Sequence, residues 1–286
     1  MDSQTQDLLA LLELEQLEQN LFRGESRDIG AAQVFGGQVL GQALAAASRT
    51  VEGRIVHSLH AYFLRRGDFN APIVYEVDRS RDGHSFSNRR VIAIQHGEQI
   101  FNMTASFQVV ESGLEHQIEM PQVPPPEQLP DMMDVLRPML DRFPERMRRF
   151  LEKPRPFEFR MVQPLNPLEP QKTAPSRQVW LRSCGPIPDG ESLHRMLLAY
   201  VSDYYLLDTA VLPHGMTYFS SKVILASIDH AMWFHRPLRV DDWLLYAIDS
   251  PSASGARGFG RGSVFSRDGR LVASTAQEGL VRVVGR

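Results

Sequence analysis

The stretch Ser227-Ile-Asp-His-Ala-Met-Trp-Phe-His-Arg-Pro237 decides the fold, because the chain carries a simpler copy of it. Aromatic and β-branched residues followed by a proline predict a β-strand. Four polar side chains, those of Ser227, Asp229, His230 and His235, nevertheless fall within nine residues. Buried polar groups need hydrogen-bond partners, so such a strand is more typical of a functional site than of a purely structural sheet.

The earlier copy is His57-Ser-Leu-His-Ala-Tyr-Phe-Leu-Arg-Arg-Gly67, and further segments repeat in the same order. The offsets stay between 170 and 173 residues across four segments, which indicates an internal duplication. Each unit is predicted to be one long helix followed by about four antiparallel strands, and two such units should pair to bury their apolar faces. The matched pairs are His60-Ala61 with His230-Ala231, Pro72–Asp78 with Trp243–Asp249, Gly83 and Phe86 with Gly255 and Phe259, and Gly97 and Thr104-Ala105 with Gly269 and Thr275-Ala276.

Periodicity and prolines predict the remaining organisation. Apolar residues at helical spacing predict helices over residues 7–20, 34–50 and 192–207, and Pro144 to Leu151 fits a short helix. A cluster of prolines after residue 110 indicates a linker lying over the surface. The predicted domains are therefore 1–110, an N-terminal unit; 111–156, a proline-rich linker; and 157–286, a C-terminal unit. Strands are expected over 57–64, 72–78, 86–95, 99–108, 157–161 and 177–182.

Composition excludes several classes of protein. A net charge of −3 without a long basic run argues against a nucleic-acid partner. The single cysteine, Cys184, excludes an intramolecular disulfide and a cysteine-based metal cluster. No apolar run reaches the roughly 18 residues of a membrane span, and the first residues do not resemble a secretory signal. We therefore expect a cytoplasmic protein.

Gly36, Gly37 and Gly41 superficially resemble a phosphate-binding loop, but Gln42-Ala43 stand where that motif requires Lys and Ser or Thr. The favoured interpretation is a helix of small residues that packs closely against its neighbours. The alternative, which stays open, is that the free N–H groups at its start face a ligand.

The second unit carries an acid that the first lacks. Asp203 lies on the apolar stripe of the predicted helix 192–207, whereas residues 34–50 contain no carboxylate. Burial of an unpaired carboxylate is costly, so Asp203 needs partners, a raised pKa or access to water at the edge of the stripe. Together with Ser227 and Gln277, on two strands of the same unit, it could hold a water molecule and accept its proton.

Two rival chemistries fit the residues less well. In a regular strand Ser227 and His230 point to opposite faces, which argues against a Ser-His-Asp triad, and no Gly-x-Ser-x-Gly sequence is present. His230 and His235 also alternate, and no His-Glu-x-x-His motif occurs, which argues against a metal site. Both histidines are interpreted as structural, with a smaller chance that they line a pocket.

The quoted motifs resemble the acyl-CoA thioesterase II family, the bacterial TesB type, over nearly the whole chain. Its fold is an α+β double hotdog, two tandem units in which an antiparallel sheet wraps a long helix, and this agrees with the repeat. The motifs are Leu21–Gly24, Val34–Gln42, His57–Leu64, Arg81–Ser87, Ser227–Pro237, Ser252–Phe259 and Val272–Gly279.

The resemblance implies that Asp203, Ser227 and Gln277 are the catalytic set, with Ser227 where well-known bacterial members have Thr. It implies hydrolysis of medium- to long-chain acyl-CoA to a fatty acid and CoA by direct attack of water, without a metal or cofactor. Gly36 and Gly37 are candidate oxyanion donors, and a homo-dimer or tetramer is expected. Two alternatives remain open: an enoyl-CoA hydratase, whose motif the chain lacks, and a non-catalytic acyl-CoA-binding protein.

Overall fold

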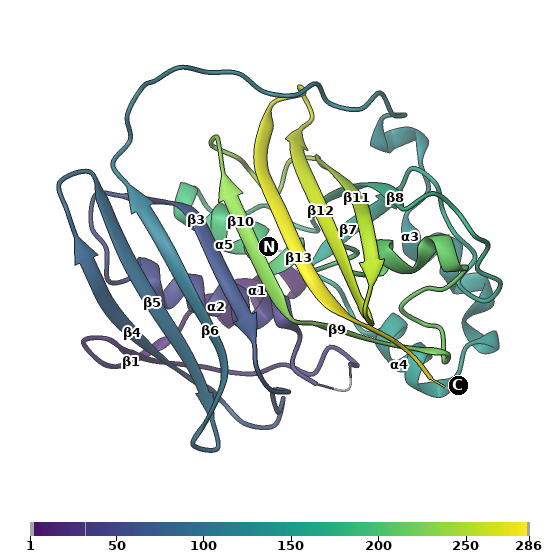
Figure 1. Cartoon of the computed structure of the whole chain (residues 1–286), viewed down its shortest axis with the longest axis horizontal. Helices are drawn as coiled ribbons and strands as arrows, with labels where there is room; N and C mark the ends of the chain where they lie inside the picture. The colour runs from purple at the N-terminus through teal and green to yellow at the C-terminus, as the bar shows by residue number, and fades with distance from the viewer. Residues whose placement is uncertain (1–2, 32, 285–286) are drawn as a thin grey trace.

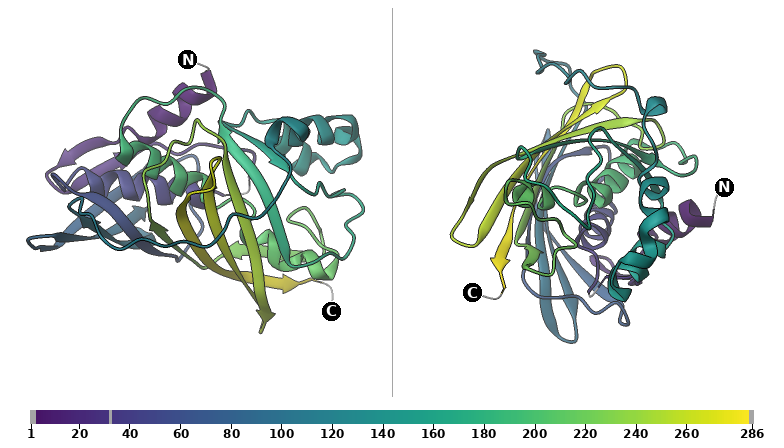
Figure 2. Two further views of the ribbon diagram at one scale, coloured as in Figure 1. Left: turned by 90° about the horizontal axis from the view of Figure 1, so that it is seen from above. Right: turned by 90° about the vertical axis from the view of Figure 1, so that its right-hand side faces the viewer.

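The computed structural model describes residues 3–31 and 33–284, which form one antiparallel sheet of 13 strands curled around two central helices (Figures 1 and 2). The central helices are α2 (Gly36–Ser48) and α5 (Glu191–Ser202), and α1 (Ser3–Leu12) packs beside α2. The strands are β1 (Glu15–Glu18), β2 (Leu21–Gly24), β3 (Ile55–Phe63), β4 (Ile73–Asp82), β5 (Phe86–Gln95), β6 (Glu98–Gln108), β7 (Phe157–Met161), β8 (Ser176–Ser183), β9 (Val223–Ser227), β10 (Asp229–Phe234), β11 (Leu244–Ser254), β12 (Arg257–Ser266) and β13 (Leu271–Val283).

The strand order is a palindrome of the two repeated units. It runs β1-β2-β4-β5-β6-β3-β10-β13-β12-β11-β8-β7, and β9 pairs with β13 beside this path. The units meet where β3 pairs with β10, and there Ala61 lies opposite His230 and His60 opposite Ala231. Because His60-Ala61 is the copy of His230-Ala231, a pseudo-two-fold axis passes between the two strands at this point. The predicted α+β double hotdog is confirmed.

Close packing of α2 against α5 explains the glycines of α2. A Cβ atom at Gly37 would lie 2.1 Å from the carbonyl oxygen of Tyr200, and one at Gly41 would lie 3.4 Å from that of Met196. A side chain at Gly37 would therefore force the two helices apart. The glycines serve helix packing, which was the favoured interpretation from sequence.

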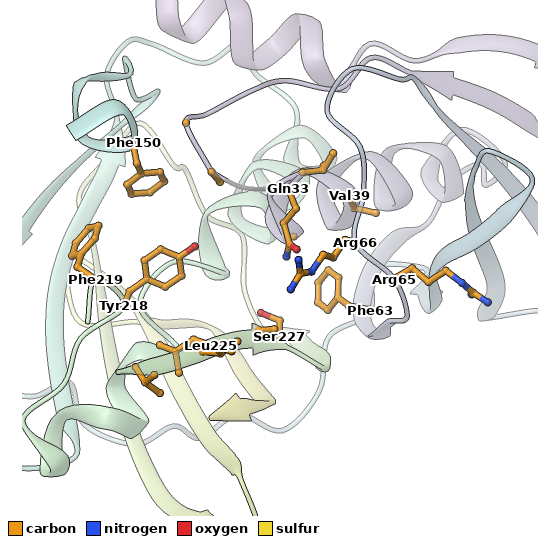
Figure 3. Close-up of a pocket in the computed structure, with 18 of the residues that line it drawn as sticks. Gln33, Val39, Phe63, Arg65, Arg66, Phe150, Tyr218, Phe219, Leu225 and Ser227 are labelled. Atoms are coloured by element: carbon orange, nitrogen blue, oxygen red, sulfur yellow. The ribbon is translucent and has the colours of Figure 1, made fainter. Parts of the chain in front are cut away.

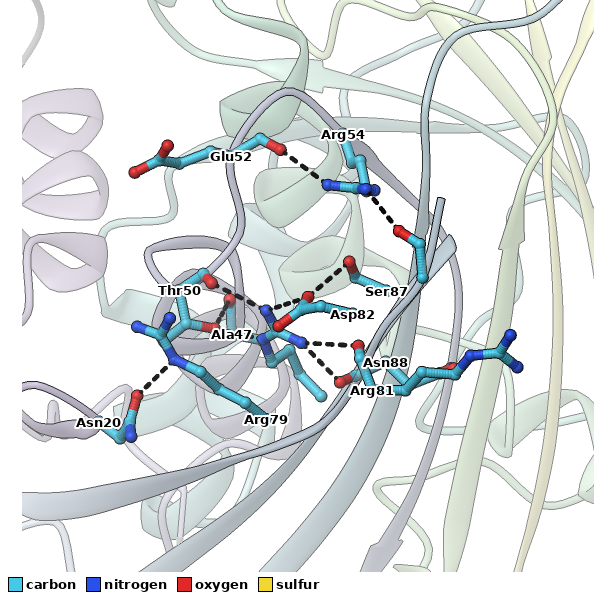
Figure 4. A network of polar contacts seen from close by, with 12 residues as sticks. Asn20, Ala47, Thr50, Glu52, Arg54, Arg79, Arg81, Asp82, Ser87 and Asn88 are labelled. Atoms are coloured by element: carbon cyan, nitrogen blue, oxygen red, sulfur yellow. Dashed lines mark hydrogen bonds and ion pairs between the residues drawn. The ribbon is translucent and has the colours of Figure 1, made fainter. Parts of the chain in front are cut away.

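A buried arginine holds the other end of α2 in place (Figure 4). The guanidinium of Arg89, on β5, is 1% exposed and donates to the hydroxyl of Thr50 at 2.8 Å and to its carbonyl oxygen at 3.0 Å. It also donates to the carbonyl oxygens of Arg81 and Asn88 and to the carboxylate of Asp82 at 2.7 Å. The hydroxyl of Thr50 in turn donates to the carbonyl oxygen of Ala47 at 2.7 Å. Because the last carbonyls of a helix lack partners within it, the network completes the C-terminal end of α2.

Three predicted elements end or break earlier than expected. The helix expected over 7–20 ends at Leu12, and the chain enters the β1–β2 hairpin. The helix expected over 192–207 ends at Ser202, so Asp203 is its C-cap residue and not an interior one. The chain turns there because Tyr205 adopts a left-handed φ of 66°, which a continuing helix does not allow. The strand expected over Ser227–Pro237 is interrupted at Ile228.

The proline-rich segment crosses the outside of the molecule and then folds against it. Residues 109–125 contain no helix or strand and pass across the ends of the strands, where the side chain of Gln117 bonds the backbone of Gly269 and Leu271 in the β12–β13 turn (Figure 1). Short helical turns follow, and those over residues 132–152 pack around Leu136, Phe143 and Leu151. They are η1 (Pro126–Gln128), α3 (Met132–Leu136), η2 (Arg137–Arg142) and α4 (Glu145–Glu152), and η3 (Asp208–His214) lies later in the chain. In the described part of the chain, no helix has the length and apolar character that crossing a membrane demands.

Candidate active site

The structure brings Asp203, Ser227 and Gln277 into one cluster. The side-chain amide nitrogen of Gln277, on β13, donates to Asp203 Oδ1 at 2.8 Å. The hydroxyl of Ser227, at the end of β9, donates to the same oxygen at 3.4 Å. Three elements that are far apart in sequence thus converge on one carboxylate.

Burial controls the charge of that carboxylate. Burial raises the pKa of Asp203 from 3.8 to about 6, while hydrogen bonds from Gln277, from the N–H of Gly37 and from Ser227 oppose the rise. The acid is therefore mostly ionised at neutral pH but is a much stronger base than an exposed aspartate. A pKa close to the working pH is what general-base catalysis requires.

A bulge places Ser227 and His230 on the same side of the sheet. Ser227 pairs with Gly279 and Ala231 with Ala276, so four steps along β9 and β10 face three steps along β13. One extra residue shifts the alternation of side chains by one position. The expectation that Ser227 and His230 point to opposite faces is therefore wrong.

His230 fixes the amide of Gln277. It is fully buried, and burial lowers its pKa to about 3, so the ring is neutral. Its Nδ1 lies 3.2 Å from the amide nitrogen of Gln277 and its Nε2 lies 3.0 Å from the hydroxyl of Ser202. Since Ser202 donates to the carbonyl oxygen of Ala199, Nε2 carries the proton and Nδ1 accepts from Gln277. His230, interpreted from sequence as structural, therefore orients a site residue.

The other end of the Gln277 amide has an unused acceptor. Gln277 Oε1 is buried and has no hydrogen-bond partner among the described residues. Buried acceptors are normally satisfied, so this oxygen fits a position that accepts a hydrogen from water.

The N-terminal end of α2 closes the cluster on its remaining side. The N–H of Gly37 donates to the carboxylate of Asp203. A Cβ atom at Gly36 would lie 2.6 Å from Asp203 Oδ2, so only glycine leaves room for the acid. The positive end of the helix dipole also favours negative charge here. From sequence it was open whether the free N–H groups at the start of this helix face a ligand. The N–H of Gly37 instead donates to the side chain of Asp203.

A cavity of about 830 Å³ reaches Ser227 and Gly36 (Figure 3). Its wall follows β9 from Ser227 past Leu225 toward Phe150, Tyr218 and Phe219, while Gln33, Phe63 and Arg66 lie on the other side of Ser227. Of the residues around it, Phe150, Tyr218, Phe219 and Arg66 were not anticipated from sequence. Phe150, Tyr218 and Phe219 come from segments outside the repeat, whereas Arg66 lies at the end of the copied stretch His57–Gly67.

Metal ligands are not grouped in the described residues, where no three His, Cys, Asp or Glu side chains come together. His235 lies apart from the cluster and bonds the hydroxyl of Ser274 at 2.8 Å. Asp229 accepts from the backbone N–H of Glu278 on β13. Of the polar residues in the opening strand, only Ser227 and His230 belong to the site.

Two family models match the chain: one described as acyl-CoA thioesterase over residues 148–280 and one as acyl-CoA thioesterase N-terminal domain over residues 24–108. Acyl-CoA thioesterase 2 of Haemophilus influenzae is 44% identical, covering 96% of this chain and 97% of its own length. Human acyl-coenzyme A thioesterase 8 is 43% identical, with coverages of 96% and 88%.

Solved structures agree in fold and sequence. The acyl-CoA thioesterase II TesB2 of Mycobacterium marinum is 44% identical and superposes with a TM-score of 0.79, covering 96% of this chain and 98% of its own. A tesB protein of Mycobacterium avium subsp. paratuberculosis is 34% identical, with a TM-score of 0.81 and coverages of 98% and 100%. The sequence motifs, the double hotdog and these matches together show that the chain belongs to the acyl-CoA thioesterase family.

Proposed function

We propose that the protein hydrolyses acyl-CoA thioesters, with Asp203, Ser227 and Gln277 as its catalytic residues. The observation that carries this proposal is the convergence of Gln277, Ser227 and the Gly37 N–H on one buried carboxylate, next to a cavity that reaches Ser227. Membership of the acyl-CoA thioesterase family supplies the substrate class.

In the proposed mechanism, a water molecule lies between Asp203 and the thioester carbonyl, and the unpartnered Gln277 Oε1 accepts one of its hydrogens. Asp203 takes a proton from the water as its oxygen attacks the carbonyl carbon. Ser227 and Gln277 hold the carboxylate so that it faces the water. No acyl-enzyme forms, because water and not a side chain attacks the thioester carbon.

The tetrahedral intermediate carries a negative oxygen that needs donors. Gly36 lines the cavity at the first turn of α2, where backbone N–H groups lack partners within the helix, and we assign it as a donor. Collapse of the intermediate breaks the C–S bond and expels the CoA thiolate. The proton held by Asp203 passes to that sulfur, which leaves fatty acid and CoA-SH and restores the carboxylate.

The acyl chain is proposed to be medium to long, because apolar residues of β9, from Ala226 to Val223, line the cavity beyond Ser227 and aromatic rings follow them. The residues of β9 from Ser227 to Val223 span about 13 Å along this wall. A cytoplasmic location and a homo-dimer or tetramer remain proposals, and light scattering coupled to gel filtration tests the second.

The test is the release of free CoA from palmitoyl-CoA, followed with a thiol reagent. The wild-type protein and Ser227→Thr, which keeps the hydroxyl, should both release CoA, and Asp203→Asn should lose most of the rate. Full activity of Asp203→Asn would refute the assignment, and no release from any chain length by the wild-type protein would refute hydrolysis.

A further inference from the structure

The cavity beside Ser227 has two chemically different ends (Figure 3). Arg66 lies on one side, and among the described residues it has no acidic partner, whereas its neighbour Arg65 pairs with Glu98 at 2.9 Å. Phe150, Tyr218 and Phe219 lie on the other side. For a thioester bound at Ser227, the end of the cavity with Arg66 therefore suits the phosphates of CoA, and the aromatic end suits the acyl chain.

A second, smaller cavity lies behind the aromatic end. Its volume is about 80 Å³, and its lining is mostly apolar, with Val135, Leu136, Met161 and Leu165 among its residues. Arg177 and Asp208, its charged members, neutralise each other across 2.8 Å. Its wall comes mostly from residues 130–167 and from residues 205–219 after α5, with Arg177 of β8.

Phe219 is the side chain that lines both cavities. Its ring packs 6.1 Å from that of Phe150 and 6.2 Å from that of Phe143. The main cavity thus ends at Phe219, and apolar space continues beyond it.

The backbone that carries Phe219 is held independently of the ring. The N–H of Thr217 donates to the hydroxyl of Ser220 at 3.0 Å, and the N–H of Ser220 donates to the carbonyl oxygen of Thr217 at 2.9 Å. The N–H of Tyr218 donates to Asp208, which Arg177 holds from the other side. Truncation of the ring should therefore leave the turn in place.

We propose that Phe219 is the end wall of the acyl-chain site and that its ring keeps the terminal methylenes of longer chains out of the apolar cavity behind it. This inference deepens the proposed hydrolysis and rests on its substrate class. With the ring present, chains that extend past Phe219 gain no further burial. With the ring removed, the two cavities join and additional methylenes leave water.

The test compares Phe219→Ala with the wild-type protein over octanoyl-, lauroyl-, palmitoyl- and stearoyl-CoA. Each additional buried methylene is worth about fourfold in kcat/KM, so the ratio of the stearoyl to the lauroyl value should rise at least about tenfold in the variant. Dissociation constants of the matching S-alkyl-CoA thioethers, which cannot be hydrolysed, should change in the same sense. The thioether series decides the subsite even if the protein turns over no thioester, so failure of the inference and failure of the proposed hydrolysis are distinguishable.

Two further variants make the test specific. Phe143→Ala removes a ring from the same aromatic cluster but lines neither cavity, so it should leave the chain-length ratio unchanged. Val135→Phe, added to Phe219→Ala, refills the second cavity and should restore the wild-type ratio. An unchanged ratio in Phe219→Ala, or an equal rise in Phe143→Ala, would overturn the proposal.

Discussion

Replacement of Asp203 by asparagine should make the protein more stable and nearly inactive. Asparagine has the same size, and its carbonyl oxygen can still accept from Gln277, but it carries no charge. Burial raises the pKa of Asp203 from 3.8 to about 6, so folding opposes its ionisation. The difference between these pKa values corresponds to about 3 kcal/mol at neutral pH, which is the upper limit of the expected gain.

The sign and pH range of this effect follow from the raised pKa. Below about pH 3.8 the carboxyl is protonated in both the folded and the unfolded state, and wild type and variant should differ little. As the pH rises to about 6, the unfolded chain ionises first, and wild-type stability falls relative to Asp203→Asn. Above that range the difference should be constant.

The assay is urea unfolding of both proteins between pH 4 and 8, together with rates of palmitoyl-CoA hydrolysis. Loss of the general base should lower kcat by roughly 10²- to 10⁴-fold. A variant that is less stable than wild type at pH 8, or a stability difference that does not change with pH, would refute the reasoning about the buried carboxylate.

Three further perturbations follow from named contacts. Ser227→Ala removes a hydrogen-bond donor that lowers the pKa of Asp203. The acidic limb of the pH–rate profile, which lies near pH 6 in wild type, should therefore move to higher pH. Ser227→Thr keeps the hydroxyl and should leave the limb in place. Gly37→Ala places a Cβ atom 2.1 Å from the carbonyl oxygen of Tyr200 and should cost about 1–3 kcal/mol in urea unfolding, whereas Gly113→Ala, with open space around it, should be neutral. Arg89→Met leaves the Thr50 carbonyl oxygen unpaired and should lower the free energy of unfolding by about 1–3 kcal/mol in the same assay. The value of kcat per folded molecule should not change. A loss of kcat without a loss of stability would contradict a structural role for Arg89.

The duplicated strands could be predicted from sequence because each hairpin carries its own local signal. Alternating apolar residues and turn glycines place β5 at its observed ends, β6 within one residue of them and β4 within four. The repeat then predicted that two units pair, whereas the junction of β3 with β10 is seen only in the structure. The convergence of Asp203, Ser227 and Gln277 could be anticipated because only the second unit offers an acid.

Local irregularities could not be predicted. Apolar residues continue through Leu206 and Leu207, so the pattern suggested an unbroken helix, and only the left-handed φ of Tyr205 ends it. The bulge between Ser227 and Ala231 depends on pairing with β13, which lies about 50 residues further along the chain. The strict alternation of a regular strand therefore predicted the wrong face of the sheet for His230. The far end of the cavity was missed because packing of non-repeated segments brings Phe150 and Phe219 together.

The central claim is that a water molecule held by Asp203, Ser227 and Gln277 attacks the thioester directly. Single-turnover hydrolysis of palmitoyl-CoA in ¹⁸O-water, with enzyme in excess and mass spectrometry of both the product and the intact protein, tests it most directly. Direct attack by water predicts that ¹⁸O enters the palmitate in the first turnover, that the protein gains no ¹⁸O, and that no acylated protein appears. Palmitate without ¹⁸O and label in Asp203 would indicate an anhydride intermediate, and a palmitoylated protein would indicate an acyl-enzyme; either result would contradict the account.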